Sequence, residues 1–396
     1  MPAAASHAPM ATPGLMALLP IMGVVFTAFL VVGLAMPVLP LHVHGGLGFG
    51  AVMVGLVAGS QFAASLVSRV WAGHYADSRG AKRAVVVGLL MTAASGLLYL
   101  LSLRFLDTPA ASVAVLLLGR TLLGGAESFV ITGALAWGLA LVNARNTGRA
   151  IAWIGTAMYA AWALGAPAGV GLCASHGFVA IALATALVPL ATPLPIAPLR
   201  PVAPQLRGRP SIAKVVRAVW IPGVGLAFSS IGFGAMTAFV VLLFAERGWN
   251  PVWLPFSAFA VAFILVRAVL GHLPDRFGGA KVALVFLLVE AAGQALIWLG
   301  PGPGLALVGA ALTGFGYSLV YPGLGVEAVR RAPPESRGLA MGAYTAFLDL
   351  ALGVAGPVLG LIAAGAGLGS VFLASALAAL CGTAIALRLP QGPSTT

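Results

Sequence analysis

The sequence predicts an all-α integral membrane protein with twelve transmembrane helices, arranged as two pseudo-symmetric bundles of six. The first observation is composition: 60% of the 396 residues are hydrophobic, 8% are charged, and the mean hydropathy is +1.05. About a quarter of the residues of an ordinary soluble domain are charged. The second is a series of apolar runs of about 20 residues, enough for a helix to cross about 30 Å of hydrocarbon. The third is a charged motif that occurs twice.

The apolar runs predict helices because every backbone polar group inside a bilayer must be bonded within the protein, and the runs lack the alternation of membrane β-strands. No positively charged region precedes the first run, so we expect a retained span rather than a cleaved signal peptide. The expected spans are residues 15–40, 48–72, 83–103, 110–142, 148–174, 176–198, 219–245, 252–270, 282–300, 303–329, 337–364 and 368–388.

A stretch rich in proline and arginine separates the sixth and seventh spans. Such a composition is typical of a linker, because proline cannot continue a helix and charged side chains remain in water. We therefore expect an N-terminal six-helix bundle at 1–190, a cytoplasmic linker at 191–217 and a C-terminal six-helix bundle at 218–396.

The formal net charge of +12 is distributed in short loops between the spans. Only Arg104 and Arg247 lie in the loops on one side, which predicts that both termini are cytoplasmic by the positive-inside rule. This pattern indicates a multi-pass membrane protein with a lipid bilayer and not a nucleic acid as its partner, and we expect the membrane to be a bacterial inner membrane. Cys173 and Cys381 lie in apolar surroundings and form no metal-ligand pattern, so we expect no metal and no cofactor.

The charged motif at Gly73–Arg83 reads Gly-His-Tyr-Ala-Asp-Ser-Arg-Gly-Ala-Lys-Arg, a short loop between two apolar runs. A related version follows at Gly271–Lys281. Several pairs of identical residues lie 198 positions apart, among them Arg69 with Arg267, Asp77 with Asp275 and Gly80 with Gly278. Further along, the offset is 190, for Gly124 with Gly314, Ser128 with Ser318 and Pro167 with Pro357. The simplest explanation is two homologous halves.

The pattern G-x-x-x-D-x-R-G-x-K-R resembles the loop 2–3 signature of the major facilitator superfamily. The resemblance implies alternating access around a site between the halves, and a gating role for the two loops in which Asp77 faces the inner end of the eleventh span. The alternative is a plain solvated turn. The gating residues that this resemblance implies are Gly73, Asp77, Arg79, Gly80, Lys82 and Arg83, with a weaker counterpart at Asp275 and Arg276.

Charged residues inside the spans are the candidates for proton coupling. Each such residue costs at least about 2.5–3.5 kcal/mol to insert, so it normally faces a cavity or a partner. Arg120 and Glu127 are two helical turns apart on one face, in a stretch that resembles the superfamily's span-four arginine motif, which the family links to proton coupling. Arg120 either tunes Glu127 or meets an anionic substrate. Asp349 in the eleventh span is a second candidate, for a proton or substrate site, with packing as the alternative. For Arg120 and Glu127 the alternative is a buried ionic or hydrogen-bonded pair that only holds helices together.

Aromatic side chains in the spans are candidates for the substrate cavity, with packing as the alternative. We expect Tyr159 and Tyr317 to line it because buried phenol hydroxyls need partners, and we add Phe29 and Trp162. Span five, which contains Tyr159 and Trp162, resembles imperfectly the glycine–proline antiporter motif of drug and sugar exporters.

The expected function is secondary active transport of a small organic solute, with proton-coupled efflux of a sugar or drug-like substrate. The Gly-Ala-Glu-Ser-Phe and Asn-Thr-Gly-Arg-Ala stretches resemble bacterial sugar-efflux and drug–proton antiporter members of the superfamily. The alternative is a facilitator or a proton-symport importer of a small metabolite. No nucleophile–base pair or metal cluster indicates an enzyme, no filter pattern indicates a channel, and no phosphate-binding loop indicates ATP as the energy source. We expect a monomer whose partners are a small-molecule substrate and protons.

Overall fold

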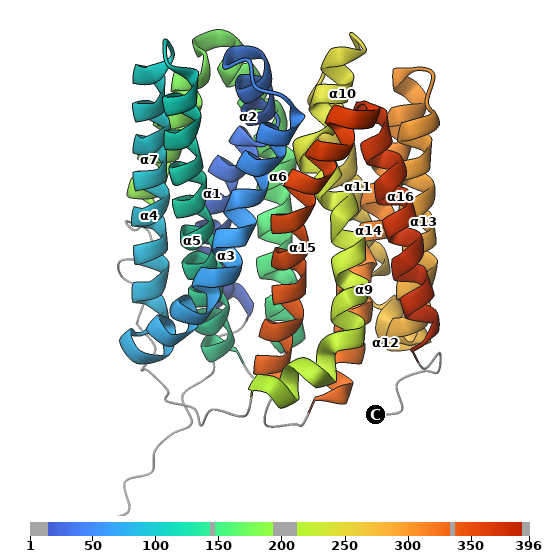
Figure 1. Cartoon of the computed structure of the whole chain (residues 1–396). Helices are drawn as coiled ribbons and strands as arrows, with labels where there is room; N and C mark the ends of the chain where they lie inside the picture. The colour runs from blue at the N-terminus through green and yellow to red at the C-terminus, as the bar shows by residue number, and fades with distance from the viewer. Residues whose placement is uncertain (1–14, 143–146, 193–211, 333–336, 390–396) are drawn as a thin grey trace, which may run out of the picture.

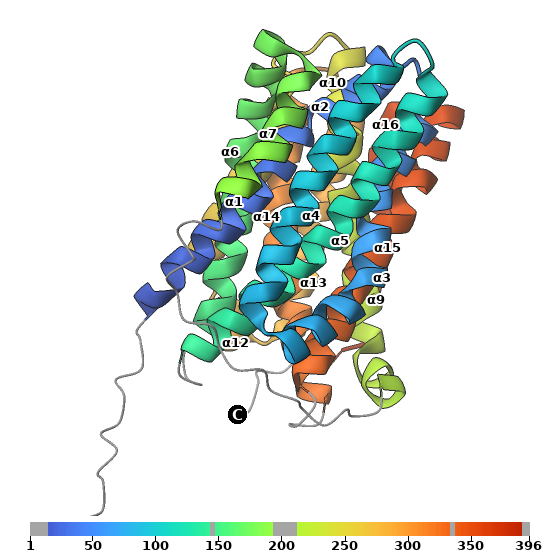
Figure 2. The same cartoon turned by 90° about the vertical axis from the view of Figure 1, so that its left-hand side faces the viewer.

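A computed structural model describes residues 15–142, 147–192, 212–332 and 337–389, and the regular structure in these ranges is helical. Two groups of long helices stand side by side (Figure 1), and the first group faces the viewer when the molecule is turned by 90° (Figure 2). The first half contains α1 (Leu19–Ala35), α2 (Val38–Leu41), α3 (Ala51–Arg79), α4 (Ala81–Ser102), α5 (Pro109–Leu141), α6 (Thr147–His176) and α7 (Phe178–Ala191). The second half contains α9 (Ile212–Ala238), α10 (Val240–Glu246), α11 (Leu254–Leu270), α12 (Leu273–Phe277), α13 (Gly279–Leu299), α14 (Pro303–Arg331), α15 (Arg337–Ala366) and α16 (Leu368–Leu387).

The helices confirm the predicted fold class. Within the described ranges, 10 helical stretches are long and apolar enough to cross a membrane, and the shorter apolar helices α7 and α11 complete the twelve expected spans. Proline residues in the first turn begin α5 and α14, where the missing N–H has no helical partner to lose. Gly177 and Gly367, both with positive φ, form the short turns before α7 and α16.

The expected linker lies mostly outside the described residues. Its last part, from residue 212 to 217, belongs to α9, which begins at Ile212. The proposed boundaries of the two bundles otherwise remain a prediction.

The charged motif after the second span is not a loop, and this expectation was wrong. Helix α3 continues through Gly73 and Asp77 to Arg79, and α4 begins at Ala81 with Lys82 and Arg83 in its first turn. The reversal occurs at Gly80, whose φ of 100° is a conformation that other residues rarely adopt. Gly73 makes no close approach, because the space around it is open. The helix continues because nothing before Gly80 removes a backbone hydrogen bond.

The corresponding segment of the second half is interrupted. Helix α11 ends at Leu270, and Pro274 occupies the first turn of the separate short helix α12, which carries Asp275 and Arg276. Gly278, with φ 92°, makes the turn into α13 in the same way as Gly80. The end of the molecule that contains Gly80 and Gly278 is called the hinge end below, and the opposite end, near α2 and α10, is called the far end (Figure 1).

The internal repeat predicted from the sequence has a matching structure. Ser128 donates a hydrogen bond from Oγ to the carbonyl oxygen of Ser65 at 2.8 Å, and Ser318 donates the equivalent bond to Phe263, also at 2.8 Å. These partners are related by the offsets of 190 and 198. The hydrogen bond between α5 and α3 is therefore repeated between α14 and α11.

The halves meet along two helix pairs. Near the far end, α3 and α15 approach so closely that a Cβ on Gly356 would overlap with the carbonyl oxygen of Gly55, the kind of contact that small residues permit between membrane helices. On the other side, Tyr159 of α6 stacks on Phe263 of α11 with ring centroids 3.7 Å apart. The candidate site lies between these two contacts and the hinge end.

Candidate functional site

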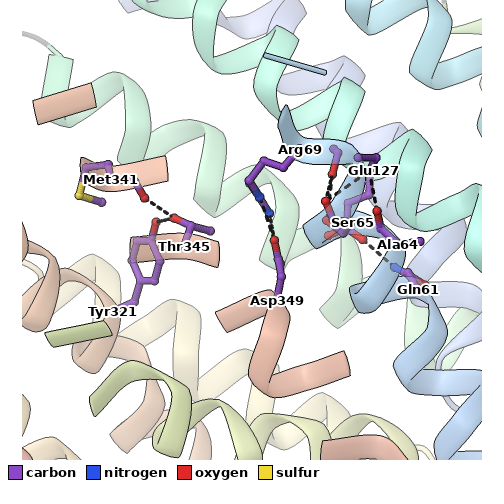
Figure 3. A network of polar contacts seen from close by, with 11 residues as sticks. Gln61, Ala64, Ser65, Arg69, Glu127, Tyr321, Met341, Thr345 and Asp349 are labelled. Atoms are coloured by element: carbon purple, nitrogen blue, oxygen red, sulfur yellow. Dashed lines mark hydrogen bonds and ion pairs between the residues drawn. The ribbon is translucent and has the colours of Figure 1, made fainter. Parts of the chain in front are cut away.

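An ion pair joins the two halves at the centre of the site. Arg69 of α3 donates from Nε to Oδ2 of Asp349 on α15 at 2.8 Å, and its Nη2 contacts the same oxygen (Figure 3). Asp349 is buried, with 3% of its surface exposed. Asp349 was predicted as a proton-coupling residue, and the structure adds the partner that the prediction lacked.

Glu127 of α5 lies beside this pair. Gln61 of α3 donates a hydrogen bond from Nε2 to its Oε2 at 2.7 Å (Figure 3). The next residue, Ser128, donates a hydrogen bond to the carbonyl oxygen of Ser65, one turn before Arg69 on α3. Two carboxyl groups, from different halves, therefore share the neighbourhood of one arginine. We call Glu127, Arg69 and Asp349 the carboxylate site.

Arg120 is 5% exposed and lies away from the hinge end. Its Nε reaches the carbonyl oxygen of Val57 at 3.4 Å, and its buried Nη1 has no hydrogen-bond partner among the residues the structure describes. The guanidinium lines a cavity of about 20 Å³, large enough for about one water molecule, that Thr237 of the second half also lines. Arg120 and Glu127 share a helix face as predicted but form no ion pair in this conformation.

The four predicted aromatic residues belong to one cluster that crosses between the halves. Trp162 contacts Phe29 at 5.8 Å and Tyr159 at 5.1 Å between ring centroids. It also stacks on Phe233 of α9, which in turn stacks on Tyr317 of α14 at 5.3 Å. Phe29, Trp162 and Tyr317 are buried, whereas Tyr159 is partly exposed. That they line a substrate cavity remains a prediction.

The predicted gating residues other than Gly80, which is buried, are exposed or half-buried at the hinge end. Asp77 is exposed and forms no ion pair with the described residues, and the first side chains of α15 fall outside them. Arg79, Arg83, Asp275 and Arg276 are also exposed. The latch between Asp77 and the start of α15 therefore remains a prediction.

Sequence reasoning missed three residues of the site. Gln61 and Phe263 lie in apolar runs where nothing marked them as special. Arg69 was recognised only as part of the repeat, together with Arg267. The signal that could have found both arginines is their position one turn inside the span, where a charge needs a partner.

Other charged groups in the spans lie elsewhere. Glu290 of α13 is buried and accepts a hydrogen bond from Ser229 of α9 at 2.5 Å, within the second half. Glu327 pairs with Arg330 at 2.7 Å near the end of α14. Among the described residues, no three His, Cys, Asp or Glu side chains converge as metal ligands.

Comparison with known proteins covers nearly the whole chain. The family model described as Major Facilitator Superfamily matches residues 21–278 and 252–396. An uncharacterized MFS-type transporter of Salmonella typhimurium is 43% identical over 385 residues, which cover 97% of this chain and 98% of the relative. An uncharacterized MFS-type transporter of Burkholderia mallei is 43% identical over 368 residues, covering 92% and 90% of the two chains.

Solved structures share the fold at low sequence identity. A D-xylose–proton symporter superimposes with a TM-score of 0.77 at 12% identity, covering 96% of this chain and 99% of the other. The human organic anion transporter MFSD10 gives a TM-score of 0.72 at 16% identity, covering 94% and 100%. These likenesses concern the arrangement of helices.

Proposed function

Because the chain belongs to the major facilitator superfamily and is therefore a secondary transporter rather than an enzyme, we propose that it exports a small organic solute in exchange for protons. The observation that carries this proposal is the carboxylate site, in which Arg69 pairs with Asp349 of the opposite half and Glu127 of its own half is held by Gln61 on the same helix as Arg69. The names of the solved structures mention an organic anion and D-xylose, so the fold alone selects no substrate.

The Arg69–Asp349 pair links protonation to the contact between α3 and α15. Removing one partner of a buried ion pair costs about 3–5 kcal/mol, because a buried charge is left uncompensated. When the halves separate here, Asp349 must lose its guanidinium partner. Taking up a proton neutralises the carboxylate and removes that cost.

Glu127 supplies a second carboxyl group with which Arg69 can pair. It lies in the same half as Arg69 and packs on the same helix, so it stays near Arg69 when α15 moves away. A carboxyl group beside a guanidinium favours its charged form, and a desolvated carboxyl group favours its neutral form. Arg69 therefore exchanges between Asp349 and Glu127, and the carboxyl group that it leaves takes up the proton.

The proposed direction of transport rests on the predicted orientation and on the family resemblance. The basic loops support a cytoplasmic hinge end in the inner membrane, with both termini on that side. The resemblance to sugar-efflux and drug–proton antiporter members supports export. A facilitator would use the same rocking motion without the proton switch, and a symporter would move solute and proton together.

The experiment expresses the protein in bacteria that lack their major efflux pumps and measures retention of sugars, small organic acids and amphipathic cations. Each solute is tested with and without a protonophore, in wild type, in Glu127→Gln and in the control Glu246→Gln, whose carboxyl group is exposed at the end of α10. We expect one class to be expelled only with the gradient intact and Glu127 present. If neither the protonophore nor Glu127→Gln changes the expulsion of the solute, the result would contradict proton coupling and support a facilitator.

A further inference from the structure

The carboxylate site has a symmetry-related counterpart on the other side of the molecule. The offset of 198 relates Arg69 to Arg267, and the offset of 190 relates Asp349 to Tyr159. The matching hydrogen bonds of Ser128 and Ser318 show that both offsets hold in the folded chain around these positions. The crossing of α3 and α15 therefore corresponds to the crossing of α11 and α6.

The structure brings Arg267 and Tyr159 into the same neighbourhood. Tyr159 stacks on Phe263, one turn before Arg267 on α11. The Arg267 guanidinium carbon lies 5.7 Å from the centroid of the same Phe263 ring. Arg267 and Tyr159 lie on opposite halves, at positions that correspond to those of Arg69 and Asp349.

The counterpart lacks its acid. The residue that corresponds to Asp349 is Tyr159, a neutral phenol in place of a carboxylate. Arg267 forms no ion pair with any side chain in the described ranges. Arg267 is half-buried near the hinge end of α11. The Tyr159 hydroxyl can donate a hydrogen bond to an anion but cannot neutralise the arginine.

We propose that Arg267 and Tyr159 bind the carboxylate group of the transported solute, which takes the place that Asp349 occupies beside Arg69. A guanidinium presents a planar pair of N–H donors that matches a carboxylate, and the phenol adds a third donor. The partly exposed ring of Tyr159 offers an apolar surface for the rest of an organic acid. The proposal deepens the transport function above by naming a substrate class, organic carboxylates.

The test measures binding to the purified full-length protein in detergent, by the rise in thermal unfolding temperature on adding ligand. The probes are benzoate and hexanoate, each paired with its neutral amide, benzamide or hexanamide. We expect a carboxylate to stabilise the wild type more than its amide does. Hydrogen bonds to a charged group are worth about 1.5–3 kcal/mol, so Arg267→Gln should weaken carboxylate binding by about tenfold or more.

Two further variants and one control separate binding from folding. Tyr159→Asp supplies an internal carboxylate, so it should keep the protein folded and abolish carboxylate binding. Arg267→Lys keeps the charge but loses the paired donors, so it should bind with intermediate affinity. Arg104→Gln removes an exposed arginine near the far end and should bind as the wild type does.

The proposal is overturned if no carboxylate stabilises the wild type more than its amide at millimolar concentration. It is also overturned if carboxylates bind Tyr159→Asp or Arg267→Gln as tightly as the wild type. Detergent solution holds no proton gradient, so these outcomes do not depend on coupling. Failure of the antiport proposal would appear instead as efflux that is the same in Glu127→Gln as in the wild type.

Discussion

Arg69 and Asp349 lie 280 positions apart in the sequence and form an ion pair across the two halves of the transporter. Both Nε and Nη2 of Arg69 contact one carboxylate oxygen, so the pair specifies how α3 faces α15 (Figure 3). The first prediction concerns the energy of this contact.

Asp349→Asn should destabilise the protein by about 3 kcal/mol, because Arg69 keeps its charge without a counter-ion in a mostly buried place. The double variant Arg69→Gln, Asp349→Asn should be more stable than the sum of the two single changes implies, since neither charge is then left alone. Thermal unfolding in detergent of the four proteins measures this coupling. Strict additivity would show that the two side chains do not interact.

Gly356→Val should block transport, because any side chain at this position overlaps with the backbone of Gly55 and keeps α3 from approaching α15. The matched control is Gly342→Ala on the same helix, where a Cβ meets no atom within 4 Å. Solute efflux is compared at equal amounts of protein in the membrane. Normal transport by Gly356→Val would mean that the close approach of these helices is not required.

Ser128→Ala and Ser318→Ala should destabilise the protein to a similar extent, because the two hydroxyl groups make equivalent hydrogen bonds in the two halves. The expected cost is about 0.6–1.5 kcal/mol each, the range for such bonds in membrane and soluble proteins. Unfolding in detergent measures both. A loss confined to one of the two variants would contradict the structural equivalence of the halves.

Gly80→Ala should destabilise the hinge by about 1–3 kcal/mol, because a side chain is strained at a φ of 100°. Gly73→Ala should be neutral or stabilising by up to about 1 kcal/mol, since Gly73 lies inside α3 with open space around it. Thermal unfolding distinguishes the two glycines. Equal effects of the two substitutions would indicate that Gly73 and Gly80 belong to one loop, as the sequence predicted.

The spans and the repeat could be predicted because they depend on local properties. Hydropathy placed the ends of α14 and α16 close to the expected spans at 303–329 and 368–388. The two offsets identified Ser128 and Ser318 as equivalent, and the structure gives each the same hydrogen bond.

The contacts between the halves could not be predicted, because they depend on the rotation of helices that are far apart in the sequence. Asp349 was identified as a buried acid, but nothing local indicates that it faces Arg69 and not another helix. The prediction that the charged motif forms a loop was wrong for a different reason. Polar residues such as Asp77 and Arg79 are typical of a loop, yet at the end of a span their side chains reach solvent while the backbone stays helical.

The most direct test of the account measures proton movement driven by the solute. Inside-out membrane vesicles are acidified by respiration, and a pH-sensitive dye reports the gradient when a transported solute is added. For an antiporter that uses Glu127, the solute should dissipate the gradient in the wild type and in Glu246→Gln but not in Glu127→Gln. A gradient that the solute leaves unchanged in the wild type, or dissipates equally in Glu127→Gln, would contradict the proton switch between Glu127 and Asp349.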